Sequence, residues 1–201
     1  VFRTHASPEI GVGHVMRCLA LANVLSGLGC KSIFAVSPET PATVPALGRS
    51  DHEILFVDAD AETAVKTLTR KITEPVDWLV IDHYGIDLDS EKIFRKLARN
   101  IMVIDDLADR KFDCHLLLNQ NLGIDKSYYE NKVPPDCVLL LGTNYALLRP
   151  EFSRLRYKAI AKRKSTNSIN NIIISMGGSD VNNITHSILE NIPNYYNVVV
   201  V

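Results

Sequence analysis

The stretch VFRTHASPEIGVGHVMRCLALANVLSGL, residues 1–28, decides the fold class of this chain. Val1–Thr4 has the composition of a short strand, a glycine loop follows it, and the apolar spacing of Val15–Leu28 predicts a helix. A buried strand that runs through a glycine loop into a helix is typical of parallel α/β sheets. We therefore expect an α/β protein.

The same alternation of strand and helix patterns continues to about residue 141. Further strands are expected at Ser32–Val36, Glu53–Val57, Trp78–Asp82, Ile101–Asp105, His115–Asn119 and Val138–Leu141. Further helices are expected at Ala61–Lys71 and Asp89–Arg99. The strands are continuous apolar runs, as strands buried on both faces should be. The sequence thus predicts a Rossmann-like parallel sheet with helices on both faces.

A basic stretch interrupts this pattern. Residues 153–164 contain six Lys and Arg residues and no acid, which is typical of a solvated helix face, with anion binding as the alternative. A new cycle follows it, with a strand at Asn171–Met176, a helix at Val181–Glu190 and a strand at Asn197–Val201. We interpret residues 1–150 as an N-terminal catalytic domain, 151–170 as a connector and 171–201 as the truncated start of a second α/β domain.

Composition narrows the class of protein. A net charge of −1 gives no general reason to expect nucleic-acid or membrane binding, and no apolar run approaches the ~20 residues of a membrane span. The four cysteines form no CxxC pair, so metal or redox spacing is absent. Cys18 and Cys30 are expected to be buried free thiols, which fits a reducing, cytoplasmic compartment.

The first glycine loop carries the best chemical signal, Gly11-Val12-Gly13-His14 with Arg17 one turn later. The helix behind the loop offers unpaired N–H groups and a positive dipole end, which favour an anion. That positive field disfavours an imidazolium, and a neutral histidine is a competent general base. His14 is therefore the candidate base; the alternative is an ordinary first-turn residue. Arg17-Cys18 occupies the third glycine position of the dinucleotide fingerprint, so that motif is excluded.

Three other predicted strands end in polar residues. The endings are Asp82-His83-Tyr84-Gly85, Asp105-Asp106 and Asn119-Gln120-Asn121. Because ligands of open parallel sheets bind beyond the carboxyl ends of the strands, these residues are expected to line one rim with His14. Each could instead shape a turn. Asp105 or Asp106 is the candidate for orienting a catalytic histidine. No set of residues shows metal-ligand spacing, and no serine nucleophile elbow is present.

A second glycine motif, Met176-Gly177-Gly178-Ser179-Asp180, precedes a predicted helix with Asn183 in its first turns. Backbone N–H groups at such a junction hold phosphate; the alternative is a glycine turn with an N-cap. With the first glycine loop, it suggests a ligand that has a phosphate part and a reacting part.

The order of several segments resembles one family. These are FRTHASPEIGVGHVMRCLALA, VIDHYGID, IDDLADR, LLNQN, YALLRPEF and MGGSDVNN. Together, over nearly all 201 residues, they resemble the UDP-2,4-diacetamido-2,4,6-trideoxy-β-L-altropyranose hydrolases of pseudaminic acid biosynthesis, a pathway of flagellin glycosylation. The chain departs from the family at His5, where the family usually carries Asp.

The resemblance implies a two-domain glycosyltransferase-B-like fold and hydrolysis of a UDP-sugar to UDP and free sugar. It implies that His14 activates water at the anomeric carbon, with inversion, and that Tyr84 lies near the sugar. The expected substrate-binding residues are Gly11, Gly13, Arg17, Tyr84, Asp105, Asn119 and Arg149, and the expected UDP-phosphate residues are Gly177, Gly178, Ser179 and Asn183. We expect a cytoplasmic monomer that needs no metal or cofactor. The alternatives are a sugar transferase of similar fold and a non-catalytic nucleotide-sugar-binding partner.

Overall fold

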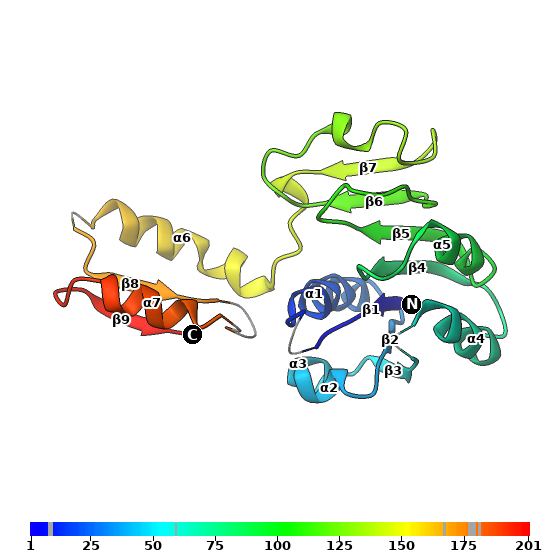
Figure 1. Ribbon diagram of the computed structural model, residues 1–201, viewed down its shortest axis with the longest axis horizontal. Helices are drawn as coiled ribbons and strands as arrows, with labels where there is room; N and C mark the ends of the chain where they lie inside the picture. The colour runs from blue at the N-terminus through cyan, green and yellow to red at the C-terminus, as the bar shows by residue number, and fades with distance from the viewer. Residues whose placement is uncertain (8–9, 59, 167, 177–179, 181) are drawn as a thin grey trace.

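The structure is a computed structural model, and it describes residues 1–7, 10–58, 60–166, 168–176, 180 and 182–201. Its largest element is a seven-stranded parallel sheet with the strand order β3-β2-β1-β4-β5-β6-β7 (Figure 1). The strands are β1 (Phe2–Thr4), β2 (Ile33–Val36), β3 (Glu53–Phe56), β4 (Val76–Asp82), β5 (Ala98–Ile104), β6 (Leu116–Asn119) and β7 (Val138–Leu141). The parallel sheet and its helices confirm the predicted Rossmann-like α/β class.

The direction of strand addition reverses between β1 and β4. The chain adds β2 and β3 on one side of β1, then crosses to β4 and continues outward to β7. At such a switch point the loops after two neighbouring strands turn away from each other and leave a crevice at the carboxyl edge. The register places Thr4 opposite Asp82 at this edge. The ends of β1 and β4 therefore lie side by side where a ligand crevice is expected.

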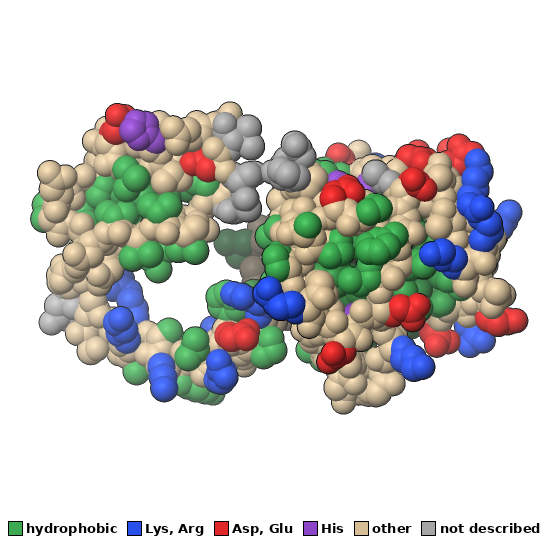
Figure 2. All heavy atoms as spheres, turned by 90° about the horizontal axis from the view of Figure 1, so that it is seen from below, with side chains coloured by type: hydrophobic (Ala, Val, Ile, Leu, Met, Phe, Trp, Pro, Cys, Tyr) green, Lys and Arg blue, Asp and Glu red, His purple; other side chains and the backbone are tan. Residues whose placement is uncertain are grey.

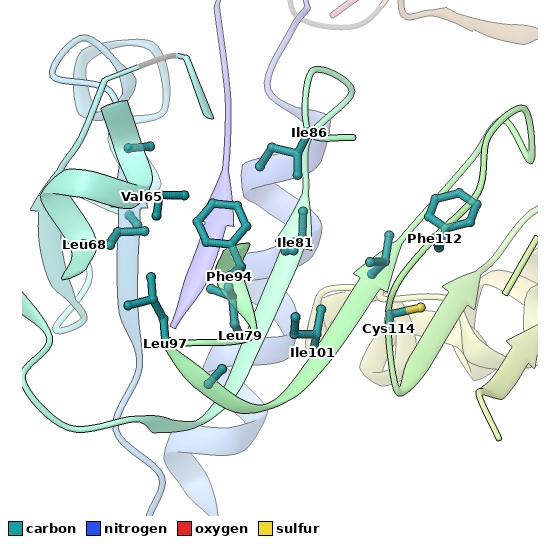
Figure 3. Packing of buried hydrophobic residues seen from close by; sticks show 14 of the residues in the cluster. Val65, Leu68, Leu79, Ile81, Ile86, Phe94, Leu97, Ile101, Phe112 and Cys114 are labelled. Carbon is teal, nitrogen blue, oxygen red and sulfur yellow. The ribbon is translucent and has the colours of Figure 1, made fainter. Parts of the chain in front are cut away.

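Helices cover both faces of this sheet. They are α1 (Gly13–Gly27), α2 (Thr40–Thr43), α3 (Pro45–Gly48), α4 (Ala61–Lys71) and α5 (Leu88–Phe94), with 3₁₀ turns η1 (Lys126–Tyr129) and η2 (Thr143–Tyr145). Val80 packs in the core beneath α1, whereas its neighbours Leu79 and Ile81 pack in the core beneath α4 and α5. Figure 3 shows the second core, where Leu68 and Phe94 meet the strands. Side chains alternate across the strand, so both faces are buried, as predicted.

Local sequence explains where α4 begins. The carboxylate of Asp60 accepts hydrogen bonds from the backbone N–H groups of Glu62 and Thr63 at 3.0 and 3.2 Å. These bonds satisfy donors that a helix start otherwise leaves unpaired. Val65 and Leu68, three positions apart on one face, then carry the helix onto the sheet.

The C-terminal end of the predicted helix Asp89–Arg99 was wrong. Helix α5 stops at Phe94, and β5 begins at Ala98, which pairs with Val76 of β4. Leu97 and Ala98 are buried, and their apolar character fits a helix and a strand equally well. Pairing with β4 decides between the two. The short helices α2 and α3 were not predicted.

The basic stretch forms helix α6 (Pro150–Lys164), and every residue of this helix is exposed. Figure 2 shows its Lys and Arg side chains spread along its length. Beyond it, β8 (Asn171–Ile174), α7 (Ile184–Asn191) and β9 (Asn197–Val200) form a βαβ unit with a two-stranded parallel sheet. The division into domains at residues 151–170 stays a prediction. Among the described residues, no helix has the length and apolar character needed to cross a bilayer.

The two sheets should differ in local stability. In hydrogen exchange on this 201-residue chain, we expect the amides of residues 79–82 to exchange at least ~10-fold more slowly than those of residues 172–174. Residues 79–82 of β4 are all buried and the strand is paired on both sides, whereas β8 pairs with β9 alone and only Ile174 in it is buried. Equal protection of the two segments would contradict this expectation.

Candidate active site

The glycine loop after β1 is shaped by backbone hydrogen bonds. The N–H of Gly11 donates to the carbonyl oxygen of Ser7 at 2.8 Å, and Gly11 has a φ of +83°, which strongly favours glycine. Helix α1 begins two residues later at Gly13, with no side chain capping its first turn. The helix start therefore presents its dipole and N–H groups without a side-chain acceptor from the described residues.

His14 lies in the first turn of α1 with only 6% of its surface exposed. Its Nδ1 atom lies 3.3 Å from the carbonyl oxygen of Asp82 and 3.4 Å from the Oδ1 atom of the same residue. Both neighbours of Nδ1 are oxygen acceptors, so the neutral ring is best satisfied with its proton on Nδ1. That tautomer leaves a lone pair on Nε2, the atom a general base needs.

A buried ion-pair network lies beside His14. Arg17 donates from Nε and one terminal nitrogen to the two carboxylate oxygens of Asp82, both at 2.6 Å. Its other terminal nitrogen donates to both oxygens of Asp106 at 2.8 Å. The Asp82 side chain is fully buried and the Arg17 side chain is 10% exposed. Burial opposes the charge of Arg17, but the hydrogen bonds and charges of the two carboxylates raise its pKa overall.

Tyr84 covers the histidine from the loop after β4. Its ring meets the imidazole of His14 edge to face, with the centroids 4.5 Å apart. Its hydroxyl donates to Asp106 Oδ2 at 3.3 Å, and the side chain remains half exposed. Partial burial, followed by the negative charge of Asp106, raises the pKa of Tyr84. Tyr84 thus forms the solvent-facing wall of the site.

Tyr129, Asp105 and Asn119 form a second polar cluster. Tyr129 donates from its hydroxyl to Asp105 Oδ2 at 2.6 Å and accepts from Asn119 Nδ2 at 2.8 Å. Asp105 also accepts from the N–H of Ala108. Burial and the bond to Asp105 raise the pKa of Tyr129. Asp105 and Asn119 are buried, and the polar atoms named here form hydrogen bonds within the protein. The role of these two residues in binding substrate stays a prediction.

The histidine partner differs from the one that the sequence suggested. Asp82, and neither Asp105 nor Asp106, contacts His14. The position of Asp82 in the sequence could have identified it as the partner of His14. Asp82 ends the strand next to β1 and lies two residues after Val80, on the face that α1 covers.

Several predicted residues come together and others do not. Gly11, Gly13, His14, Arg17 and Tyr84 meet around the ends of β1 and β4. Arg149 instead lines a cavity of about 410 Å³ together with Met16 and Asn23 of α1. The predicted phosphate residues Gly177, Gly178 and Ser179 lie outside the described residues.

The start of α7 favours the capping alternative. Asp180 accepts hydrogen bonds from the N–H groups of Ile184 and Thr185, both at 2.8 Å. Asn183 precedes the helix in a left-handed conformation with a φ of 50°. Asp180 therefore satisfies donors at the helix start that a phosphate would otherwise contact; phosphate binding at Asn183 stays a prediction.

Two further histidines lie next to the site. The rings of His5 and His83 are 5.3 Å apart, and His83 Nδ1 accepts a hydrogen bond from the N–H of Gly85. Burial lowers the pKa of His83 to about 3, and the positive charge of Arg3 acts in the same direction. Among the described residues, no three His, Cys, Asp or Glu side chains cluster as a metal ion would require.

Two relatives match almost the whole chain, although no family model matches it. The UDP-2,4-diacetamido-2,4,6-trideoxy-β-L-altropyranose hydrolase of Campylobacter jejuni is 30% identical over 194 residues, which is 96% of this chain. The predicted family resemblance is confirmed. An uncharacterized protein of Methanocaldococcus jannaschii is 27% identical over 93% of the chain. The chain spans 65% of the length of the hydrolase and 38% of the length of the archaeal protein.

Removing Arg17 should destabilise the protein strongly. We expect Arg17→Met to lower the free energy of unfolding by about 3–5 kcal/mol, because it leaves the buried Asp82 carboxylate without its cation. Lys66→Met, at an exposed ion pair on α4, is the matched control and should change stability little. Urea unfolding measures both. An Arg17→Met protein as stable as the control would show that the network contributes nothing.

His83 should make the protein acid-sensitive. Its folded pKa lies below that of the unfolded chain, so the unfolded chain binds a proton below pH 6.5 that the folded protein does not. Stability is therefore lost as the pH falls from 6.5 toward 3. Between pH 6.5 and 5, wild type should lose about 1–2 kcal/mol more than His83→Asn, whose amide oxygen can still accept from Gly85. Parallel stability–pH profiles would refute this assignment.

Proposed function

We propose that this protein hydrolyses a UDP-sugar, UDP-2,4-diacetamido-2,4,6-trideoxy-β-L-altrose, to UDP and the free sugar in pseudaminic acid biosynthesis. The observation that carries the proposal is the contact between His14 Nδ1 and Asp82 at the switch point of the sheet. The likeness to the Campylobacter jejuni hydrolase over 96% of the chain supports the choice of substrate.

His14 acts as the general base in this proposal. Asp82 holds the proton of the ring on Nδ1, so Nε2 takes a proton from water as the water oxygen attacks the anomeric carbon. The bond from that carbon to the UDP oxygen breaks, and UDP leaves with the electron pair. The Asp82 carboxylate stabilises the imidazolium that forms, as the carboxylate of a catalytic triad does. A single displacement of this kind inverts the anomeric centre.

Arg17 has a positioning role in this proposal. With four hydrogen bonds to Asp82 and Asp106, its guanidinium has little capacity left for a substrate. Its guanidinium pairs with the buried Asp82 carboxylate, and that carboxylate in turn contacts the histidine. We therefore propose that Arg17 positions Asp82 and does not bind the substrate directly.

The uncapped start of α1 and the glycines of its loop suit an anionic group of the ligand. The exposed part of Tyr84 suits the sugar. A second domain of a glycosyltransferase-B-like fold would hold UDP through Gly177, Gly178 and Ser179. We further propose that the protein acts as a cytoplasmic monomer without a metal or cofactor.

The direct test follows the reaction by NMR. The protein is incubated with the UDP-sugar and EDTA, with no acceptor added, and we expect equal amounts of UDP and free sugar. Turnover only in the presence of an acceptor would identify a transferase. Binding without turnover would leave a non-catalytic role, and either result would overturn the proposal.

Replacing the proposed base should abolish most activity. His14→Gln should reduce kcat by about 10²–10⁴-fold, because the water loses its proton acceptor. His186→Gln, on the exposed surface of α7, is the control and should retain full activity. Near-wild-type kcat in a folded His14→Gln protein would contradict the assignment.

Tyr84→Phe should alter kinetics without altering stability. The hydroxyl forms one long hydrogen bond at a half-exposed position, so its loss should leave the melting temperature within about 2 °C. If the hydroxyl contacts the sugar, KM or kcat should change by about 5–30-fold. A large fall in melting temperature with unchanged kinetics would assign Tyr84 to packing instead.

A further inference from the structure

Two cysteine thiols lie in contact at the edge of the sheet opposite the candidate active site. Cys114 lies just before β6, and Cys137 lies just before β7. Their sulfur atoms are 3.7 Å apart although the residues are 23 positions apart in sequence. Because β6 and β7 are parallel, these residues occupy the N-terminal edge, whereas His14 and Asp82 occupy the carboxyl edge.

The distance between the two sulfur atoms suits a disulfide. Leu116 pairs with Val138, and the N–H of Val138 donates to the carbonyl oxygen of His115 at 2.9 Å, so the backbones next to the two cysteines are held together. A disulfide has an S–S distance of about 2.05 Å, and the two sulfur atoms already lie 3.7 Å apart. The sulfur atoms need to close by less than 2 Å.

The two thiols differ in access. Cys114 is buried in the core that Figure 3 shows, whereas Cys137 is half-buried and lines a surface cavity of about 520 Å³ with Tyr129 and Pro134. A small thiol reagent can therefore reach Cys137 first, with Cys114 directly behind it. Cys18 and Cys30 have no such partner, since no other pair of cysteine sulfurs in the described part of the chain is in contact.

We propose that Cys114 and Cys137 form a redox-active dithiol, which is converted to an intramolecular disulfide by exchange with a small disulfide such as oxidised glutathione.

The exchange proceeds in two balanced steps. The thiolate of Cys137 attacks one sulfur of the small disulfide, forms a mixed disulfide and expels one thiolate. Cys114 then loses its proton to solvent or to the expelled thiolate. Its sulfur attacks the Cys137 sulfur and expels the second thiolate. Two protein thiols are oxidised, and one small disulfide is reduced to two thiols.

The surroundings favour this order of attack. The hydrogen bond from the Cys114 thiol lowers the pKa of Cys137, against the effects of burial and of Asp136. The same hydrogen bond, together with burial and the charge of Cys137, raises the pKa of Cys114. Once Cys137 is a mixed disulfide, it no longer carries that charge, so this obstacle to ionising Cys114 is reduced.

The test is a map of the thiols after oxidation. The folded chain is treated with excess oxidised glutathione at pH 7.5, quenched with acid, alkylated and digested for mass spectrometry. We expect one internal disulfide between the Cys114 and Cys137 peptides, which also forms in Cys30→Ser, and in that variant two glutathione thiols are released for each disulfide formed. Cys114→Ala should instead stop at a glutathione adduct on Cys137.

A second variant covers the case in which Cys114→Ala does not fold. Cys137→Ser, at the half-buried position, should leave Cys114 unmodified, because glutathione cannot reach it directly. A wild-type chain that accumulates the Cys137 adduct with Cys114 still free would overturn the proposal. Reaction at Cys30 alone would overturn it as well. The test needs no UDP-sugar, so its outcome is separate from that of the proposed function.

Discussion

The rest of the site depends on the buried ion pair between Arg17 and Asp82. A guanidinium on α1 reaches across the sheet face and is held by carboxylates from the ends of β4 and β5. Removing such charges from water costs several kcal/mol per ion, so the network is weak evidence for surplus stability. Its consequence is geometric. The bidentate contact fixes the rotation of α1 relative to β4, and that rotation brings His14 Nδ1 to Asp82.

The strand pattern could be predicted because seven continuous apolar runs are separated by clear turn signals. The parallel sheet then follows, and so does the convergence of polar residues on its carboxyl edge. Which carboxylate would contact His14 could not be predicted. Asp82 and Asp105 both follow apolar strands, and only the strand order and the face of each side chain separate them. The end of α5 was predicted wrongly for a similar reason. Leu97 and Ala98 fit a helix and a strand equally well, and only the pairing of Ala98 with β4 decides between the two.

The cysteines mark another limit of sequence reasoning. Cys30 was expected to be buried and is exposed, because helix α1 ends at Gly27 and the chain turns outward before β2. No contact between Cys114 and Cys137 was predicted, since spacing alone reveals only local pairs. The two cysteines come together because each lies just before one of two adjacent parallel strands, β6 and β7. A contact of this kind depends on sheet register, which the apolar pattern of Leu116 and Val138 does not specify.

Strand order explains why the chemistry gathers at one place along the sheet edge. The loop after β1 turns into α1, and the loop after β4 turns toward α5 on the opposite face. The two loops therefore diverge, and Tyr84, in the loop after β4, covers His14. Asp106, one strand further, then contacts both Arg17 and Tyr84. One carboxylate therefore links the buried ion pair to the half-exposed Tyr84, and a movement of Tyr84 would break its 3.3 Å hydrogen bond to Asp106 and its ring contact with His14, while the contact between His14 and Asp82 could stay intact.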